Sequence, residues 1–155
     1  MMRFDLSGRR LPAALTEADV KKTGKIVSKL LRLKKPTEVG LRFVSEREIQ
    51  RLNRAFRKKN RPTDVLSFSP PDASSFKLQA SSFPYLGDIA ICPPYAAKEA
   101  RRRSIPVKEE LIRLLVHGIL HLKRYDHCHE REEMRMFALQ ERAVESIVKP
   151  LTSNL

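Results

Sequence analysis

The sequence lacks long hydrophobic runs and contains very little cysteine. No stretch approaches the roughly 18 to 20 consecutive apolar residues that a transmembrane helix needs. Residues 1–8 also lack the apolar segment of a secretory signal peptide. The two cysteines, Cys92 and Cys128, cannot build a disulfide framework and indicate reduced thiols. We therefore expect a cytoplasmic protein that is not bound to a membrane.

Acidic residues are scarce relative to basic ones. The chain has 31 lysines and arginines against 18 aspartates and glutamates, which gives a formal net charge of +13. Such an excess favours polyanionic partners, because each neutralised phosphate releases counterions. It favours nucleic acid above all, although a basic surface that only keeps the protein in solution is the alternative.

The length and composition indicate one globular domain, residues 1–155. A chain of 155 residues with 41% hydrophobic and 32% charged residues can bury a real core, and we find no internal repeat or low-complexity linker. Apolar periodicity and capping residues predict helices after Thr16, from Ser45 to before Pro62, over 95–103, from about Pro106 through His121, and over 130–148. Strands are expected at 39–45, 64–68 and 87–92, with a long loop at 69–86.

This order of elements predicts an α+β fold with a small mixed sheet packed against helices. The helix carrying His117 and His121 has apolar residues on nearly all sides, so we expect it to be the buried central helix. For the last helix, the inward residues are expected to be Met134, Phe137, Ala138, Val144 and Ile147.

Three of the four histidines, His117, His121 and His127, fall within eleven residues. The first two are four residues apart, so on a helix both imidazoles leave the same face one turn apart. We expect a turn to bring the third back towards them. Three neutral imidazoles arranged in this way hold a divalent cation and leave a coordination position open for water, which is typical of a catalytic metal site.

The histidine spacing is similar to that of the metzincin proteases, with one essential difference. Those enzymes carry a glutamate directly after the first histidine as general base. Here that position is Gly118, which cannot transfer a proton. A metallopeptidase is therefore disfavoured.

Basic residues are concentrated between positions 51 and 61. Four of them, Arg54, Arg57, Lys58 and Arg61, follow i, i+3, i+4, i+7 spacing and predict a basic helical stripe. Arginine can bind phosphate through two parallel hydrogen bonds, which indicates an RNA-binding surface, although a solvated helix face explains the pattern equally well. A second cluster, residues 101–103, is interpreted as solvated surface.

Other polar residues give weaker indications. Asp88 is a candidate for orienting a histidine ring through a hydrogen bond. Cys128 and His129 are expected not to bind the metal, and His129 is interpreted as a cap or surface residue. Were either a fourth ligand, a structural metal would be favoured over a catalytic one.

Taken together, these motifs resemble the YbeY family of metal-dependent endoribonucleases. The resemblance rests on the segment from His117 to His127 and on four further matches, at residues 53–57, 62–68, 86–89 and 136–141. They follow the family's order from about residue 40 to the end, whereas the first forty residues match weakly.

The resemblance implies an α+β fold and an endoribonuclease that matures the 3′ end of small-subunit ribosomal RNA and acts in ribosome quality control. It implies that His117, His121 and His127 bind one divalent metal, normally zinc, and that Arg57 is a catalytic residue contacting RNA phosphate. Single-stranded and ribosomal RNA, the small ribosomal subunit and its assembly factors are the implied partners.

Two positions depart from the family. Arg124 stands where the family usually has glycine, which would cost roughly 1 to 2 kcal/mol in a left-handed turn. The family's N-terminal strand is hard to see in residues 1–6. An alternative function is a ribosome-assembly factor that binds RNA and whose metal is structural.

Overall fold

The computed structural model describes residues 1–6, 10–70, 83–125 and 129–149. Within this part of the chain the elements are β1 (Met2–Asp5), α1 (Glu17–Leu30), β2 (Thr37–Phe43), α2 (Glu46–Arg57), β3 (Val65–Phe68), β4 (Tyr85–Ile91), α3 (Pro93–Arg103), α4 (Val107–Leu122) and α5 (Glu130–Val148). The helices and strands predicted from the sequence are all present. Two of the expected caps are confirmed, because the side chains of Thr16 and Ser45 accept hydrogen bonds from the backbone amides of Asp19 and Glu48.

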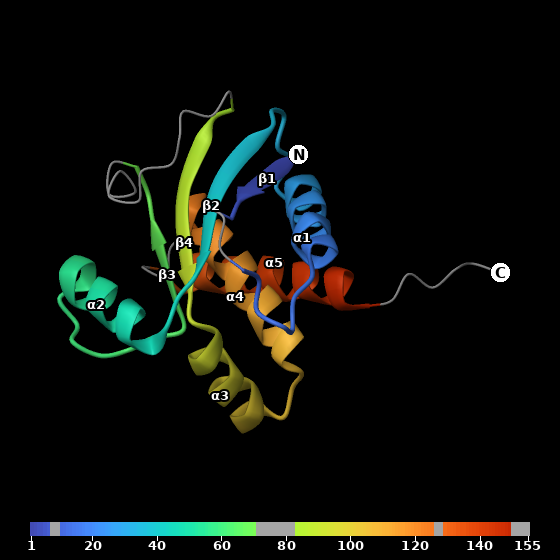
Figure 1. The fold of residues 1–155 in the computed structure, drawn as a ribbon. Helices are drawn as coiled ribbons and strands as arrows, with labels where there is room; N and C mark the ends of the chain where they lie inside the picture. The colour runs from blue at the N-terminus through green and yellow to red at the C-terminus, as the bar shows by residue number, and fades with distance from the viewer. Residues whose placement is uncertain (7–9, 71–82, 126–128, 150–155) are drawn as a thin grey trace.

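The four strands form one mixed sheet in the order β1-β2-β4-β3 (Figure 1). β1 and β4 both pair parallel with β2, whereas β3 pairs antiparallel with β4. The arrangement confirms the predicted α+β class and the small mixed sheet.

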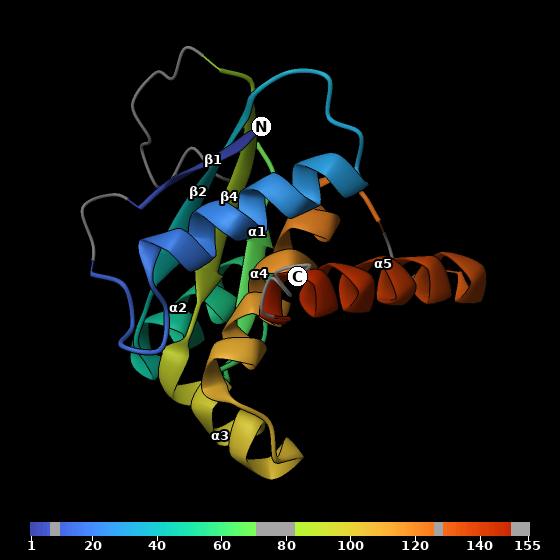
Figure 2. The ribbon, with the colours of Figure 1, turned by 90° about the vertical axis from the view of Figure 1, so that its right-hand side faces the viewer.

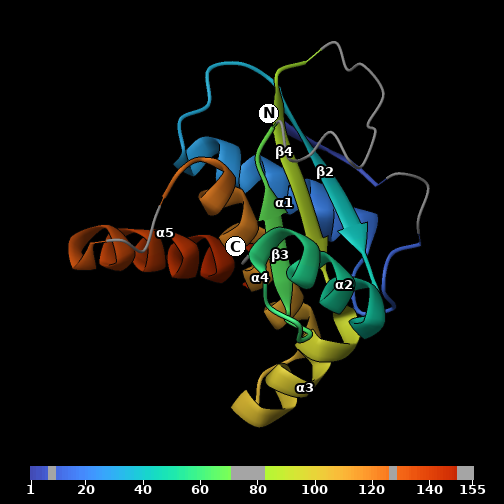
Figure 3. The ribbon, with the colours of Figure 1, turned by 90° about the vertical axis from the view of Figure 1, so that its left-hand side faces the viewer.

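Helices cover both faces of this sheet. α1, α4 and α5 lie on one side, where Leu41 and Ile89 meet the main hydrophobic core (Figure 2). α2 lies on the other side next to β3, where its Ile49 packs with Phe68 and Ala90 (Figure 3). The alternation of side chains along β4 sends Ile89 and Ala90 to opposite faces.

α4 is the buried central helix that the sequence predicted. It contacts β3, β4, α1, α3 and α5, and its apolar residues from Leu111 to Leu122 are almost all buried. His117 and His121 are the partly exposed positions near its C-terminal end. The helix thus holds two polar rings at the edge of an apolar core.

The N-terminal strand, which the sequence hardly indicated, is present as β1. Its register pairs Met2 with Thr37, and the buried backbone amide of Met2 donates to Ser28 Oγ at 2.7 Å. Its pairing partner lies far along the chain, so local sequence carries little sign of so short a strand.

The predicted inward face of α5 was partly wrong. Val144 and Ile147 are buried as expected, but Met134 is 67% exposed, Phe137 is 62% exposed, and Ala138 is exposed as well. The buried stripe instead runs through Met136, Gln140, Ala143, Val144 and Ile147, at i, i+4, i+7, i+8 and i+11. Met136 and the polar Gln140 complete the stripe that Val144 and Ile147 define, so α5 is rotated about its axis relative to the expectation.

Among the described helices, none is both long and apolar enough to cross a membrane.

Candidate functional site

Two of the predicted metal ligands, His117 and His121, meet at the C-terminal end of α4. Their Nε2 atoms are 3.0 Å apart, and their rings lie at 70° to each other with centroids 4.5 Å apart. Two imidazole nitrogens bound to one tetrahedral zinc ion at about 2.05 Å would lie about 3.3 Å apart. The pair is therefore arranged so that both nitrogens can bind one cation.

Gln140 of α5 fixes the protonation of the His117 ring. Its Oε1 lies 2.8 Å from His117 Nδ1, while its Nε2 donates to Glu141 Oε1 at 3.2 Å. A carboxylate only accepts hydrogen bonds, so the Gln140 amide must direct its oxygen at the histidine. His117 therefore carries its proton on Nδ1, which leaves Nε2, the atom that faces His121, as the unprotonated nitrogen that a metal ligand requires.

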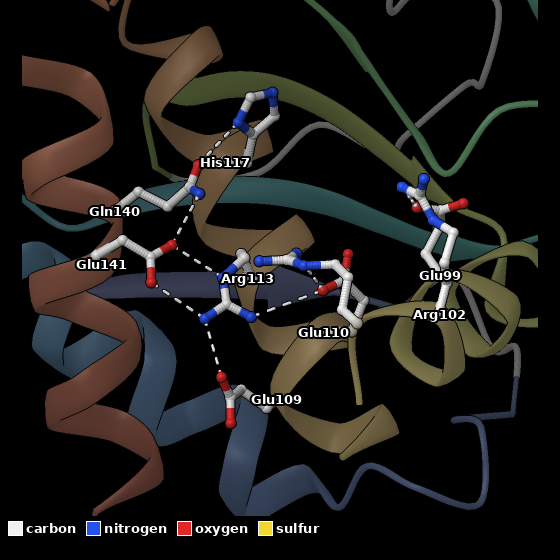
Figure 4. Close-up of polar contacts among 9 residues, drawn as sticks. Glu99, Arg102, Glu109, Glu110, Arg113, His117, Gln140 and Glu141 are labelled. Carbon is white, nitrogen blue, oxygen red and sulfur yellow. Dashed lines mark hydrogen bonds and ion pairs between the residues drawn. The ribbon is translucent and has the colours of Figure 1, made fainter. Parts of the chain in front are cut away.

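The chain of contacts continues from Gln140 through Glu141 to Arg113 of α4 (Figure 4). Arg113 donates to both carboxylate oxygens of Glu141, at 2.9 and 3.0 Å, and to Glu109 at 2.9 Å. The guanidinium holds the pKa of the Glu141 carboxyl below its ordinary value. An ion pair between α4 and α5 thus holds the residue that orients His117.

A small cavity of about 180 Å³ lies beside His117. It is lined by Asp64, Val65, Arg103, Glu110, Arg113, Leu114, His117 and Gln140. Burial raises the pKa of Glu110, although Arg103 and Arg113 act in the opposite direction. The Asp64 carboxylate accepts a hydrogen bond from the backbone amide of Val65 at 2.8 Å, a contact typical of aspartate in a turn.

Gly118 faces the sheet and has a packing role. A Cβ at this position would lie 3.0 Å from Cδ1 and Cγ2 of Ile89, so the glycine lets α4 approach β4 closely. A glutamate here would be directed into the core. The residue that serves metzincins as general base therefore has no room in this fold.

The turn that leaves α4 has a left-handed backbone at Arg124, the position where the family usually has glycine. Arg124 has φ 64°, its amide donates to His121 O at 2.9 Å, and the amide of Tyr125 donates to Leu120 O at 3.0 Å. This pair of hydrogen bonds is the Schellman motif, in which glycine is the usual left-handed residue.

The third predicted ligand, His127, lies outside the described residues, as does Cys128. Within the described ranges, no cluster of three side chains able to bind a metal is present. The three-histidine site thus remains a prediction. The structure brings two of its members, His117 and His121, together. His129 is exposed and is the N-cap residue of α5, without a side-chain cap hydrogen bond.

Arg57, the predicted phosphate ligand, is the last residue of α2 and is directed at β3. Its guanidinium donates to Ser67 O at 2.7 Å and lies 5.4 Å from the ring centroid of Phe68. β3 in turn packs against α4. The arginine is exposed and anchored on the strand next to the helix that carries His117 and His121.

The predicted basic stripe does not continue past Arg57. α2 ends there because Lys58 adopts a left-handed conformation, with φ 60°. Lys58 and Arg61 therefore do not share a helical face with Arg54, although all are exposed. The interpretation of Arg54, Arg57, Lys58 and Arg61 as one helical stripe was wrong.

Within the part of the chain that the structure describes, Asp88 forms no hydrogen bond to a histidine. Ile89 contacts the α4 side of the sheet, so Asp88, its neighbour on β4, is directed to the opposite face. Burial raises the pKa of the Asp88 carboxyl, with Tyr85 and Arg42 acting in the opposite direction. Cys92 is a buried free thiol, which confirms the expectation of a reduced cysteine at that position.

Sequence reasoning missed the roles of Gln140, Glu141 and Arg113. Gln140 is 6% exposed and lies within the buried stripe of α5, a stripe that the sequence alone did not place correctly. A buried amide needs hydrogen-bond partners, and Gln140 has them in His117 and Glu141.

Comparison with known proteins supports the resemblance found in the sequence. The sequence model of a family described as Endoribonuclease YbeY matches residues 7–148. The chain belongs to the YbeY family. A YbeY endoribonuclease from Persephonella marina is 44% identical over 71% of this chain and 70% of its own length. One from Shouchella clausii is 40% identical over 74% of each chain.

A solved structure has the same fold. The solution structure of TM1509 from Thermotoga maritima matches with a TM-score of 0.63 and 34% identity, over 95% of this chain and 89% of that one. The YbeY architecture is therefore shown both by sequence and by structure.

Proposed function

We propose that this protein is a metal-dependent endoribonuclease that cleaves single-stranded ribosomal RNA during maturation of the small-subunit RNA 3′ end. The observation that carries the proposal is the close approach of the Nε2 atoms of His117 and His121. Gln140 holds the proton of the His117 ring on Nδ1, so that its Nε2 can bind a metal. Membership of the YbeY family and a net charge of +13 support an RNA substrate.

His117, His121 and His127 are proposed to hold one divalent cation, most simply zinc. Two imidazoles of suitable spacing, with further nitrogen from a third, are a donor set that zinc accepts while a coordination position stays open. When bound, the cation supplies Lewis acidity to the phosphate and acidifies water at neutral pH. Gln140 keeps the ring of His117 in its metal-binding tautomer.

Arg57 is proposed to bind the phosphate that reacts. Its guanidinium has five N–H donors. Two of the guanidinium nitrogens donate to Ser67 O and Phe56 O. Because β3 and Phe68 fix the side chain in advance, little ordering remains when negative charge develops on the phosphate.

We also propose that the protein acts on pre-ribosomal particles. Ribosomal RNA, the small subunit and its assembly factors are the proposed partners, and a role in ribosome quality control follows if damaged RNA is cut. A substrate of this kind and the buried reduced Cys92 favour the cytoplasm.

The test is cleavage of single-stranded ribosomal RNA by purified protein before chelation, after chelation and after zinc is returned. We expect activity to be lost and regained with the metal. His117→Ala should be inactive under all three conditions, whereas His129→Ala, which removes the exposed histidine at the start of α5, should behave as wild type. Equal cleavage by wild type and His117→Ala would indicate a contaminating nuclease. Absence of cleavage by zinc-loaded wild type would favour an assembly factor with a structural metal.

A further inference from the structure

α2 carries a basic stripe that differs from the predicted one and shares only Arg54 with it. Arg47, Arg51 and Arg54 stand at i, i+4 and i+7, so they share one face of the helix. Ile49 and Leu52 occupy the opposite face and pack into the hydrophobic cluster against the sheet. All three arginines are exposed, on the helix that Figure 3 shows at the surface beside β3.

The stripe borders a shallow groove of about 710 Å³. Its lining residues include Ser45, Arg47, Gln50, Arg51, Arg54 and Asn60. Gln50 Nε2 donates to Asn60 Oδ1 at 3.1 Å, and the buried Asn53 donates to Arg61 O at 2.9 Å. These contacts hold the segment after α2 against the helix, so one wall of the groove is fixed by hydrogen bonds.

The charge of the groove is strongly positive. Its one acidic lining residue, Glu48, forms an ion pair with Arg42 at 3.3 Å. Among the described residues, Arg47, Arg51 and Arg54 have no carboxylate within ion-pair distance. A helix face that only needed solubility would serve as well with lysine, whereas arginine presents paired donors that fit a phosphate.

We propose that this groove, formed around Arg47, Arg51 and Arg54, binds the sugar-phosphate backbone of an RNA strand outside the reacting site. The proposal rests on the proposed endoribonuclease function and extends it. Arg57 does not line the groove, but the lining arginines lie three, six and ten residues before it on α2, so the groove runs along the helix to about 15 Å from Arg57. It would therefore hold the strand that Arg57 positions, without reading its base sequence.

The test is the salt dependence of binding to an unstructured single-stranded RNA, measured by fluorescence anisotropy. Each lost phosphate contact lowers the slope of log affinity against log salt by about 0.7 for single strands, so Arg47→Gln/Arg51→Gln/Arg54→Gln should lower it by about 2. The ratio of wild-type affinity to variant affinity should then be about 20-fold smaller at about 200 mM salt than at about 50 mM salt.

The control is Lys29→Gln/Lys35→Gln/Arg101→Gln, which removes the same charge from exposed positions outside α2. It should keep the wild-type slope. An unchanged slope in the α2 variant, or an equal loss in the control, would overturn the inference, the second because it shows a general charge effect. Because binding is measured without cleavage, an altered slope in a protein that cuts no RNA would reject the proposed catalysis and leave the groove as an RNA-binding surface.

Discussion

Gln140 Oε1 and His117 Nδ1 lie 2.8 Å apart, and this contact between α5 and α4 decides which nitrogen of the histidine carries the proton. The amide is oriented in turn by Glu141, and Glu141 by Arg113. The ring at the centre of the site is thus set by a chain of hydrogen bonds that ends in an ion pair.

Replacing Gln140 with methionine should weaken metal binding while the fold is kept. Methionine is of similar length, but its thioether sulfur is only a weak acceptor for the proton of Nδ1, and loss of such a contact typically costs 10- to 100-fold in metal affinity. Zinc titration of Gln140→Met by calorimetry would measure this. Leu139→Met, on the same helix, is the control. A folded Gln140→Met protein with wild-type zinc affinity would show that the contact does not set the ligand.

Glu141→Gln should make the protein less stable at neutral pH. Arg113 lowers the folded-state pKa of this carboxyl, so its stabilisation is present above the unfolded pKa of about 4.3 and is lost as the pH falls through the folded-state value. Because the side chain is 36% exposed, we expect a loss of only about 1 to 2 kcal/mol in the free energy of unfolding.

Urea unfolding of Glu141→Gln across pH 7 to 3 would check the sign. The difference from wild type should shrink as the pH falls. Glu145→Gln, which breaks an exposed ion pair with Lys149, should cost less than about 0.5 kcal/mol. A difference for Glu141→Gln that grows at low pH would contradict the assignment.

Gly118→Ala should destabilise the protein although alanine favours helix. The added Cβ would lie 3.0 Å from the Ile89 side chain, and overpacking of this kind costs about 1 to 3 kcal/mol, against a gain of about 1 kcal/mol in helix propensity. In an Ile89→Ala background the crowding atoms are gone, so Gly118→Ala should be neutral or stabilising there. Thermal unfolding of the four proteins would show this coupling, and an equal cost in both backgrounds would refute the packing role.

Arg124→Gly should stabilise the protein by about 1 kcal/mol. Arg124 has φ 64°, a conformation that costs side-chain-bearing residues about 1 to 2 kcal/mol and glycine much less. Lys123→Gly is the control, since Lys123 has φ −83° and gains nothing from glycine. Denaturant unfolding should give a higher free energy of unfolding than wild type for Arg124→Gly and not for Lys123→Gly. A loss of stability in Arg124→Gly would mean that the arginine side chain contributes more than the strain costs.

The sequence was sufficient where the signal is local. Caps such as Thr16 and Ser45 and the continuous apolar character of α4 are properties of short segments, and the structure confirmed them. The meeting of His117 with His121 follows from helical spacing alone.

Features that depend on tertiary packing could not be read in the same way. β1 exists because Met2 pairs with Thr37, a partner remote in the sequence. The face of α5 was ambiguous because apolar residues such as Phe137 occur around much of the helix, and packing against α4 chose the side with Met136. Gln140 became recognisable as a partner of His117 only once α4 and α5 were placed together.

The most direct test of the account is to measure metal content and RNA cleavage together in wild type and His121→Ala. Nε2 of His121 lies 3.0 Å from Nε2 of His117. We predict that loss of the His121 ring abolishes both zinc retention and cleavage of single-stranded ribosomal RNA. A His121→Ala protein that is free of metal and fully active would contradict the site on which the proposed function depends.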